Sequence, residues 1–114
     1  MHLTRFADAK AYDAQGHFDM RMLRLQGRDA GPSESLWIGV SHLLPGGRTT
    51  LEASPQEKFY VALEGEVTIS NGADSVTLEP WDSCRIAPNE KRELRNDANR
   101  PATVLLAMPL PSKE

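Results

Sequence analysis

Residues 46–72 decide the fold, and they read GGRTTLEASPQEKFYVALEGEVTISNG. The centre of this stretch, residues 58–63, is rich in strand-forming side chains and is followed by Gly65. Residues 66–70 form a second short strand pattern, and Asn71-Gly72 is a strong signal for a tight hairpin turn. The stretch therefore predicts two antiparallel strands in immediate succession.

The same pattern of short apolar runs and turn residues continues on both sides. Helical periodicity is not sustained anywhere, and only residues 7–14 can form a short helical turn. Pro45-Gly46-Gly47 is expected to break the chain sharply. Many short strands separated by turns predict a β-sandwich or barrel. The further predicted strands cover residues 18–25, 36–44, 75–78, 83–87, 93–95 and 103–108.

Composition limits the function classes. The chain has 114 residues and a net charge of -3, which predicts one domain over residues 1–114 with a barrel core over about 18–108. The lack of a basic face argues against nucleic-acid binding, and the lack of a long apolar run argues against a membrane span. The N-terminus lacks a signal-peptide pattern, so we expect a cytoplasmic protein. Cys84 is the only cysteine, so an internal disulfide is impossible.

Two segments resemble the two conserved motifs of the cupin superfamily. The first family motif places His-x-His and then a glutamate between two glycines. In this chain Gly46 and Gly65 hold the glycine places, while Glu52, Ser54 and Lys58 replace the two histidines and the glutamate. The resemblance implies an all-β fold, an antiparallel double-sheet jelly-roll barrel of the RmlC-like, conserved-barrel type.

A second segment resembles the second cupin motif, and its metal-ligand position is also replaced. Arg92 stands in the place of its histidine, while Asn96 is retained. All four metal-ligand places are therefore changed, and we expect no metal and no cofactor. Small cupins commonly form dimers, so the resemblance also implies a homodimer. Phe59 and Val61 would face outward if Lys58 faces the interior, and they would supply an apolar contact surface.

The changed positions predict a different kind of pocket. Glu52 and Ser54 lie two residues apart and so share a strand face, and we expect Lys58 and Arg92 to approach them from neighbouring strands. Two cations around one carboxylate leave a net charge of about +1, equal to that of a divalent metal held by one carboxylate. We hypothesise a metal-free cupin that binds a small anionic organic molecule, such as a carboxylate, in an accessory or sensing role.

Two further residues enter the candidate ligand-binding set. His42 is in phase with Ile38 and Val40, so it is placed inward near the pocket, and Tyr60 shares the phase of Lys58. Each has a plainer reading as a packed barrel residue with its polar atoms satisfied. Trp37 and Trp81 both lie near turns, where either can line a pocket mouth, although we expect packing.

Three alternatives remain open from the sequence. The charged cluster can be a neutralised pair with no ligand. The chain can instead be a metal-independent isomerase, epimerase or lyase with Glu52 as general base. An unusual metal site of His42, Glu52 and Glu57 is a third interpretation. The register itself is open, because a slip of one residue would turn Glu57 inward in place of Lys58.

Overall fold

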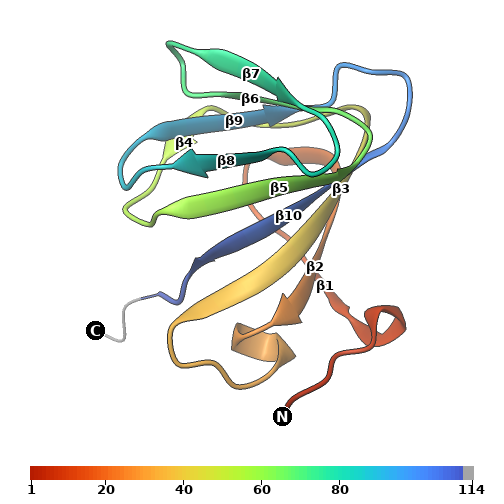
Figure 1. Ribbon diagram of the computed structural model, residues 1–114, viewed down its shortest axis with the longest axis vertical. Helices are drawn as coiled ribbons and strands as arrows, with labels where there is room; N and C mark the ends of the chain where they lie inside the picture. Colours follow the sequence, from red (N-terminus) through yellow and green to blue (C-terminus); the bar gives the residue numbers. More distant parts are fainter. Residues whose placement is uncertain (112–114) are drawn as a thin grey trace.

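The computed structural model describes residues 1–111, which are almost entirely β-structure (Figure 1). Two three-residue 3-10 helices, η1 (Phe6–Asp8) and η2 (Arg28–Ala30), flank the N-terminal strands. The strands are β1 (Lys10–Tyr12), β2 (His17–Gln26), β3 (Leu36–Thr49), β4 (Glu52–Ala53), β5 (Lys58–Glu64), β6 (Val67–Ser70), β7 (Ser75–Leu78), β8 (Ser83–Ile86), β9 (Lys91–Arg95) and β10 (Ala102–Pro109).

The strands pair antiparallel in the order β7-β6-β9-β3-β10-β5-β8, with β1 joined to β2, β2 to β3, and β4 to β9. The first and last strands of this path do not pair with each other, so the barrel is nearly closed. In Figure 1, β6, β7 and β9 form one wall, and β3, β5 and β10 form the wall facing it. The predicted all-β, antiparallel double-sheet barrel is confirmed.

The expected chain break at Pro45-Gly46-Gly47 is wrong, because β3 runs through it. Before this point β3 pairs with β10 as far as Leu43, and beyond it Arg48 pairs with Arg95 of β9. Gly46 adopts a φ of +83°, and the main chain here exchanges hydrogen bonds with Asn96. The glycine therefore bends the strand from one wall to the other instead of ending it.

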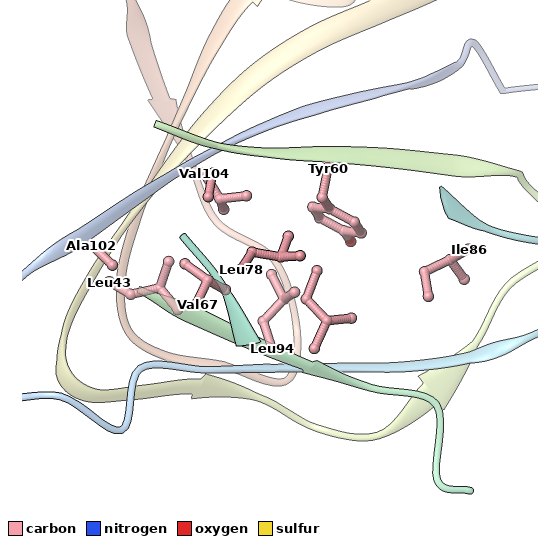
Figure 2. Packing of buried hydrophobic residues seen from close by; sticks show 10 residues of the cluster. Leu43, Tyr60, Val67, Leu78, Ile86, Leu94, Ala102 and Val104 are labelled. Atoms are coloured by element: carbon pink, nitrogen blue, oxygen red, sulfur yellow. The ribbon is translucent and has the colours of Figure 1, made fainter. Parts of the chain in front are cut away.

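A cluster of apolar side chains fills one part of the barrel interior (Figure 2). Tyr60 points into this cluster from β5 and is only 2% exposed. Its burial raises the pKa of the phenol, and the positive charge of Arg92 partly offsets that rise. The buried members of the cluster are Leu43, Tyr60, Ala62, Val67, Ile69, Leu78, Ile86, Leu94, Ala102 and Val104.

The inward phase of β3 is opposite to the predicted one. Leu43 packs in the core, whereas His42 lies on the outer face, where Phe6 meets its imidazole edge-on at a centroid distance of 6.0 Å. The N-terminal segment thus covers part of the outer face, and Val40 is 4% exposed there. Both phases of β3 are therefore apolar, so alternation alone could not identify the interior face.

The N-terminal region differs from the expected short helix. Residues 7–14 contain the end of η1 and all of β1, which pairs with β2 through Tyr12 and Met22. At residues 52–54, where Glu52 and Ser54 were expected to share a strand face, the structure has only the two-residue strand β4. Within residues 1–111, no helix is long and apolar enough to cross a membrane.

Candidate functional site

A cavity of about 330 Å³ opens at the end of the barrel where β5 begins. Four basic side chains line it: Arg24, Arg28, Lys58 and Arg92. Asp13 is the one carboxylate among its lining residues within 1–111. Tyr12 and Trp37 contribute aromatic walls, and Leu106 and Met108 of β10 contribute apolar ones. The lining is therefore strongly cationic.

Lys58, the first residue of β5, faces the interior and is 5% exposed. Its Nζ donates hydrogen bonds to Ser54 Oγ and to the Gln56 carbonyl oxygen, the latter at 3.5 Å. Glu57 points the other way and forms an ion pair with Arg85. The register question is thus resolved in favour of Lys58. Burial, assisted by the charge of Arg92, lowers the pKa of Lys58.

Arg92 enters the cavity from β9, on the strand adjacent to β4. Its Cα lies opposite that of Glu52, yet in the described part of the chain no carboxylate is within ion-pairing distance of Arg92 or Lys58. Arg92 Nε is buried and has no acceptor among residues 1–111, and the same holds for Trp37 Nε1. The site therefore has an excess of positive charge and of hydrogen-bond donors.

Arg24 forms a rigid wall of the cavity. Its guanidinium lies 3.9 Å from the ring centroid of Tyr12 and 4.4 Å from that of Trp37. Its Nε also donates to Asp29 Oδ1 at 3.0 Å, so this cation is compensated within the chain. The two aromatic rings meet edge-on at 5.9 Å. These contacts fix the position of Arg24 before any ligand binds.

His17 lies at the rim of the cavity, where β2 begins. Burial is the main cause that lowers the pKa of its imidazole, and the positive charge of Arg92 lowers it further. The contact with the Gln15 carbonyl and the negative charge of Glu52 partly offset this decrease. The contact joins Nδ1 to the Gln15 oxygen at 2.8 Å. The neutral imidazole is therefore favoured near neutral pH, and His17 adds a polar group to the site rather than another full charge.

The structure brings together three of the six predicted ligand-binding residues, because Ser54, Lys58 and Arg92 all line the cavity. Glu52 is exposed and lies outside the lining, since β4 is a two-residue strand at the edge of the mouth. Its position therefore does not support the general-base role. Tyr60 is in the apolar core, although its phenol interacts with the Arg92 side chain of the cavity. His42 Nδ1 contacts Thr103 Oγ1 at 3.0 Å on the outer face.

Sequence reasoning missed Arg24, Arg28, Asp13 and His17, and for Trp37 it favoured packing over a place at the pocket mouth. For Arg24 a signal was present, because it follows Met20 and Met22 at alternate positions of one strand. Asp13 and His17 follow β1, Arg28 lies in η2, and Trp37 is near the start of β3. Their approach to the cavity depends on how β1 and β2 fold across the mouth, which no local pattern indicates.

The residues at the family's metal-ligand places do not fit a divalent cation. Lysine and arginine side chains offer protonated donors, and Glu52 lies outside the cavity. Among residues 1–111, no three His, Cys, Asp or Glu side chains gather as a metal cluster. The alternative set of His42, Glu52 and Glu57 is therefore wrong, because His42 is on the outer face and Glu57 pairs with Arg85.

A larger hollow, of about 590 Å³, lies at the opposite end of the barrel, where β5 ends. Its walls are exposed turns that carry Glu64, Glu66, Glu79 and Arg100. Among residues 1–111, no buried polar side chain lines it, so it is an open surface between turns. The smaller cavity at the other end, which is lined by the cations Lys58 and Arg92, is therefore the better candidate for a ligand site.

Known proteins resemble this chain in sequence and in fold. The family model described as "Cupin domain" matches residues 39–108. A Mycobacterium tuberculosis protein named beta-D-galactosidase is 37% identical over 115 residues, which cover 100% of this chain and 98% of that protein. The polyketide cyclase RemF from Streptomyces resistomycificus has a TM-score of 0.86 at 16% identity, with 100% of this chain and 82% of RemF covered.

A further solved structure has the same fold. An RmlC-like cupin from Shewanella frigidimarina has a TM-score of 0.78 at 15% identity, and the match covers 100% of this chain and 94% of that one. These two structural matches show the fold, while the family model and the mycobacterial relative show the relationship in sequence. The chain belongs to the cupin family.

Proposed function

We propose that this cupin binds a small organic anion, with a carboxylate as its charged group, in the cavity at the barrel mouth. The observation that carries this proposal is the pair Lys58 and Arg92, which share the cavity and form no ion pair with any carboxylate among residues 1–111. Neighbouring like charges in a partly dry site repel each other. A bound carboxylate would remove that repulsion and accept two hydrogen bonds from the guanidinium.

The dimensions and the other walls suit a small ligand. A cavity of about 330 Å³ is at the lower end of the range for small-molecule sites. Arg24 already has Asp29 as its partner and stacks on two rings, so it shapes the wall instead of competing for the ligand. Arg28, on the exposed rim, extends the positive field toward solvent and favours the approach of anions.

Titration calorimetry with acetate, pyruvate, benzoate and citrate tests this proposal. We expect Arg92→Met to weaken carboxylate binding about tenfold or more, because a charge-assisted hydrogen bond is lost. Arg85→Met is the matched control, since Arg85 lies on the outer face and pairs with Glu57. Equal losses in both variants, or no saturable binding of any of these anions to the wild-type protein, would overturn the proposal.

Glu52→Gln separates binding from base catalysis by this residue. Glu52 is exposed at the edge of the mouth, and its removal takes away a negative charge near the site. Under the binding proposal the affinity for carboxylates stays the same or rises. If Glu52 were a general base, an isomerase or lyase activity would disappear in this variant while ligand binding remained.

Glycoside hydrolysis is a second candidate, favoured by the relative named beta-D-galactosidase. Glycosidases commonly use two carboxyl groups, and here Asp13 lines the cavity while Glu52 lies at its edge. The test is hydrolysis of p-nitrophenyl β-D-galactoside by the wild-type, Asp13→Asn and Glu52→Gln proteins. Turnover that falls at least about 100-fold in Asp13→Asn would support this candidate. Turnover that is absent, or unchanged in both variants, would exclude these carboxylates as its catalytic pair.

A further inference from the structure

We infer that Lys58 is a nucleophilic lysine that forms an imine with the carbonyl group of a 2-oxo acid bound in the mouth cavity. The inference rests on the proposed function, because Arg92 is the group that would hold the carboxylate of the same molecule. The inference narrows the ligand class from organic anions to 2-oxo acids, and it adds a covalent step to anion binding.

The surroundings of Lys58 differ from those of the other lysines within residues 1–111. Lys10 and Lys91 are exposed, whereas Lys58 is 5% exposed and lines the cavity. Its Nζ contacts only neutral acceptors, Ser54 Oγ and the Gln56 carbonyl oxygen. A lysine must lose its proton before it can attack a carbonyl, and burial beside another cation favours that loss.

The electrostatics of the site agree with this geometry. Burial is the main cause that lowers the pKa of Lys58, and the Arg92 guanidinium lowers it further. A nearby carboxylate would hold the proton on Nζ, but no described carboxylate forms an ion pair with it. The cavity therefore combines a cation that stays charged, Arg92, with an amine that can become neutral.

A 2-oxo acid matches this pair of groups. Its carboxylate is attached directly to the carbonyl carbon, so one short molecule can present an anion to Arg92 and an electrophile to Lys58. The Ser54 hydroxyl, already hydrogen-bonded to Nζ, is placed to pass a proton at that atom. A simple carboxylic acid would use the arginine alone.

The proposed reaction balances without an added reagent. The Lys58 ammonium gives up one proton, and the Nζ lone pair then forms a bond to the carbonyl carbon while the π electrons move to oxygen. That oxygen receives the released proton and then a second one from nitrogen. The carbon–oxygen bond breaks, water leaves, and the product is an iminium ion. An ammonium ion and a ketone have become an iminium ion and water, with no change in charge.

Borohydride trapping tests the inference with pyruvate as the probe. Pyruvate and sodium borohydride are added to the full chain, and intact mass followed by peptide mapping locates any reduced adduct. We expect one adduct on Lys58 in the wild-type protein and at least a tenfold loss in Lys58→Arg. Lys91→Arg is the matched control and should label like the wild type, because Lys91 is exposed.

Calorimetry with lactate, which carries the carboxylate but no carbonyl, separates this inference from the proposed function. Binding of lactate and pyruvate together with labelling confined to Lys58 supports both. Binding of both acids with no adduct, or with labelling spread over exposed amines, overturns the imine and leaves anion binding intact. Absence of binding by both acids, with no adduct, overturns the 2-oxo acid and the imine together.

Discussion

The apolar core and the mouth cavity share strands β3, β5, β9 and β10, but one is lined by apolar side chains and the other by cations. Along β5, alternate side chains face inward: Tyr60 and Ala62 enter the apolar core, and Lys58 enters the mouth cavity. Tyr60 is 2% exposed and Lys58 is 5% exposed, so both are buried. Apolar packing stabilises the core, whereas burial of an uncompensated cation costs stability at the mouth.

This difference indicates that the apolar core stabilises the fold and that the mouth cavity can bind a ligand. Mutation in the apolar end should affect unfolding, and mutation in the mouth should affect binding with a neutral or favourable effect on stability. Sites at which local rules of burial are broken are commonly functional sites. The following substitutions test whether the two ends separate in this way.

The largest effect is expected in the apolar end. Leu43→Ala removes a side chain that is 0% exposed and leaves a cavity in the cluster, so we expect a loss of about 2–5 kcal/mol in the free energy of unfolding. Leu44→Ala is the control, because the neighbouring Leu44 is 56% exposed. Urea denaturation measures both. Similar losses for the two leucines would show that this cluster is not the core.

The mouth should respond in the opposite direction. Lys58→Met keeps most of the aliphatic stem and removes the buried charge, so we expect stability to rise by about 1 kcal/mol at neutral pH. Carboxylate binding should weaken in the same variant. Lys91→Met, at an exposed position of β9, should change neither quantity measurably. A Lys58→Met protein that is clearly less stable than the wild type would contradict the account of the mouth.

The difference in stability between Lys58→Met and the wild-type protein should depend on pH. Because the pKa of Lys58 is lowered in the folded protein, the unfolded chain binds more protons between this lowered value and the ordinary value of 10.5. Stability contributed by this group therefore rises with pH through that window. Thermal melts at intervals up to about pH 10 should show the advantage of Lys58→Met shrinking as pH rises. A stability difference that stays constant over this pH range would mean that the pKa of Lys58 is not lowered by folding.

The smallest effect on the fold itself is expected on the outer face of the barrel. Phe59 is 45% exposed beside Leu36, which is 40% exposed, and the predicted homodimer would cover this apolar surface. Phe59→Asp should then shift the protein toward monomer while the melting temperature of the monomer changes little. Light scattering across micromolar concentrations measures this. A wild-type protein that is monomeric throughout would contradict the prediction.

The scaffold was largely predictable because turn residues occur at strand-length intervals. Ser75–Leu78 was predicted to the residue, since a hairpin turn and Glu79-Pro80 bound it. The site was only partly predictable. Lys58 and Arg92 were identified by their motif positions, but Tyr12 and Trp37 reach the cavity through pairing of β1, β2 and β3. Such pairing between distant segments leaves no local periodicity.

His42 shows a second physical reason for error. Its neighbours in the same phase are apolar because the N-terminal segment covers part of the outer face of β3, so a half-buried outer position was mistaken for an interior one. Glu52 shows a third physical reason for error. The first motif correctly predicts its position opposite Arg92, but not the direction of its side chain. The two-residue strand β4 lies at the edge of the mouth, and the carboxylate remains exposed there.

The central claim, that the barrel mouth binds an organic anion, is tested most directly by a proton–nitrogen NMR titration with pyruvate. The two indole N–H signals serve as internal reporters, because Trp37 lines the cavity and Trp81 is 79% exposed elsewhere. We predict saturable shifts of the Trp37 indole and of backbone amides around Lys58 and Arg92, with the Trp81 indole unmoved and the shifts abolished in Arg92→Met. Shifts that are absent, or that affect both indoles equally and survive in Arg92→Met, would contradict the claim.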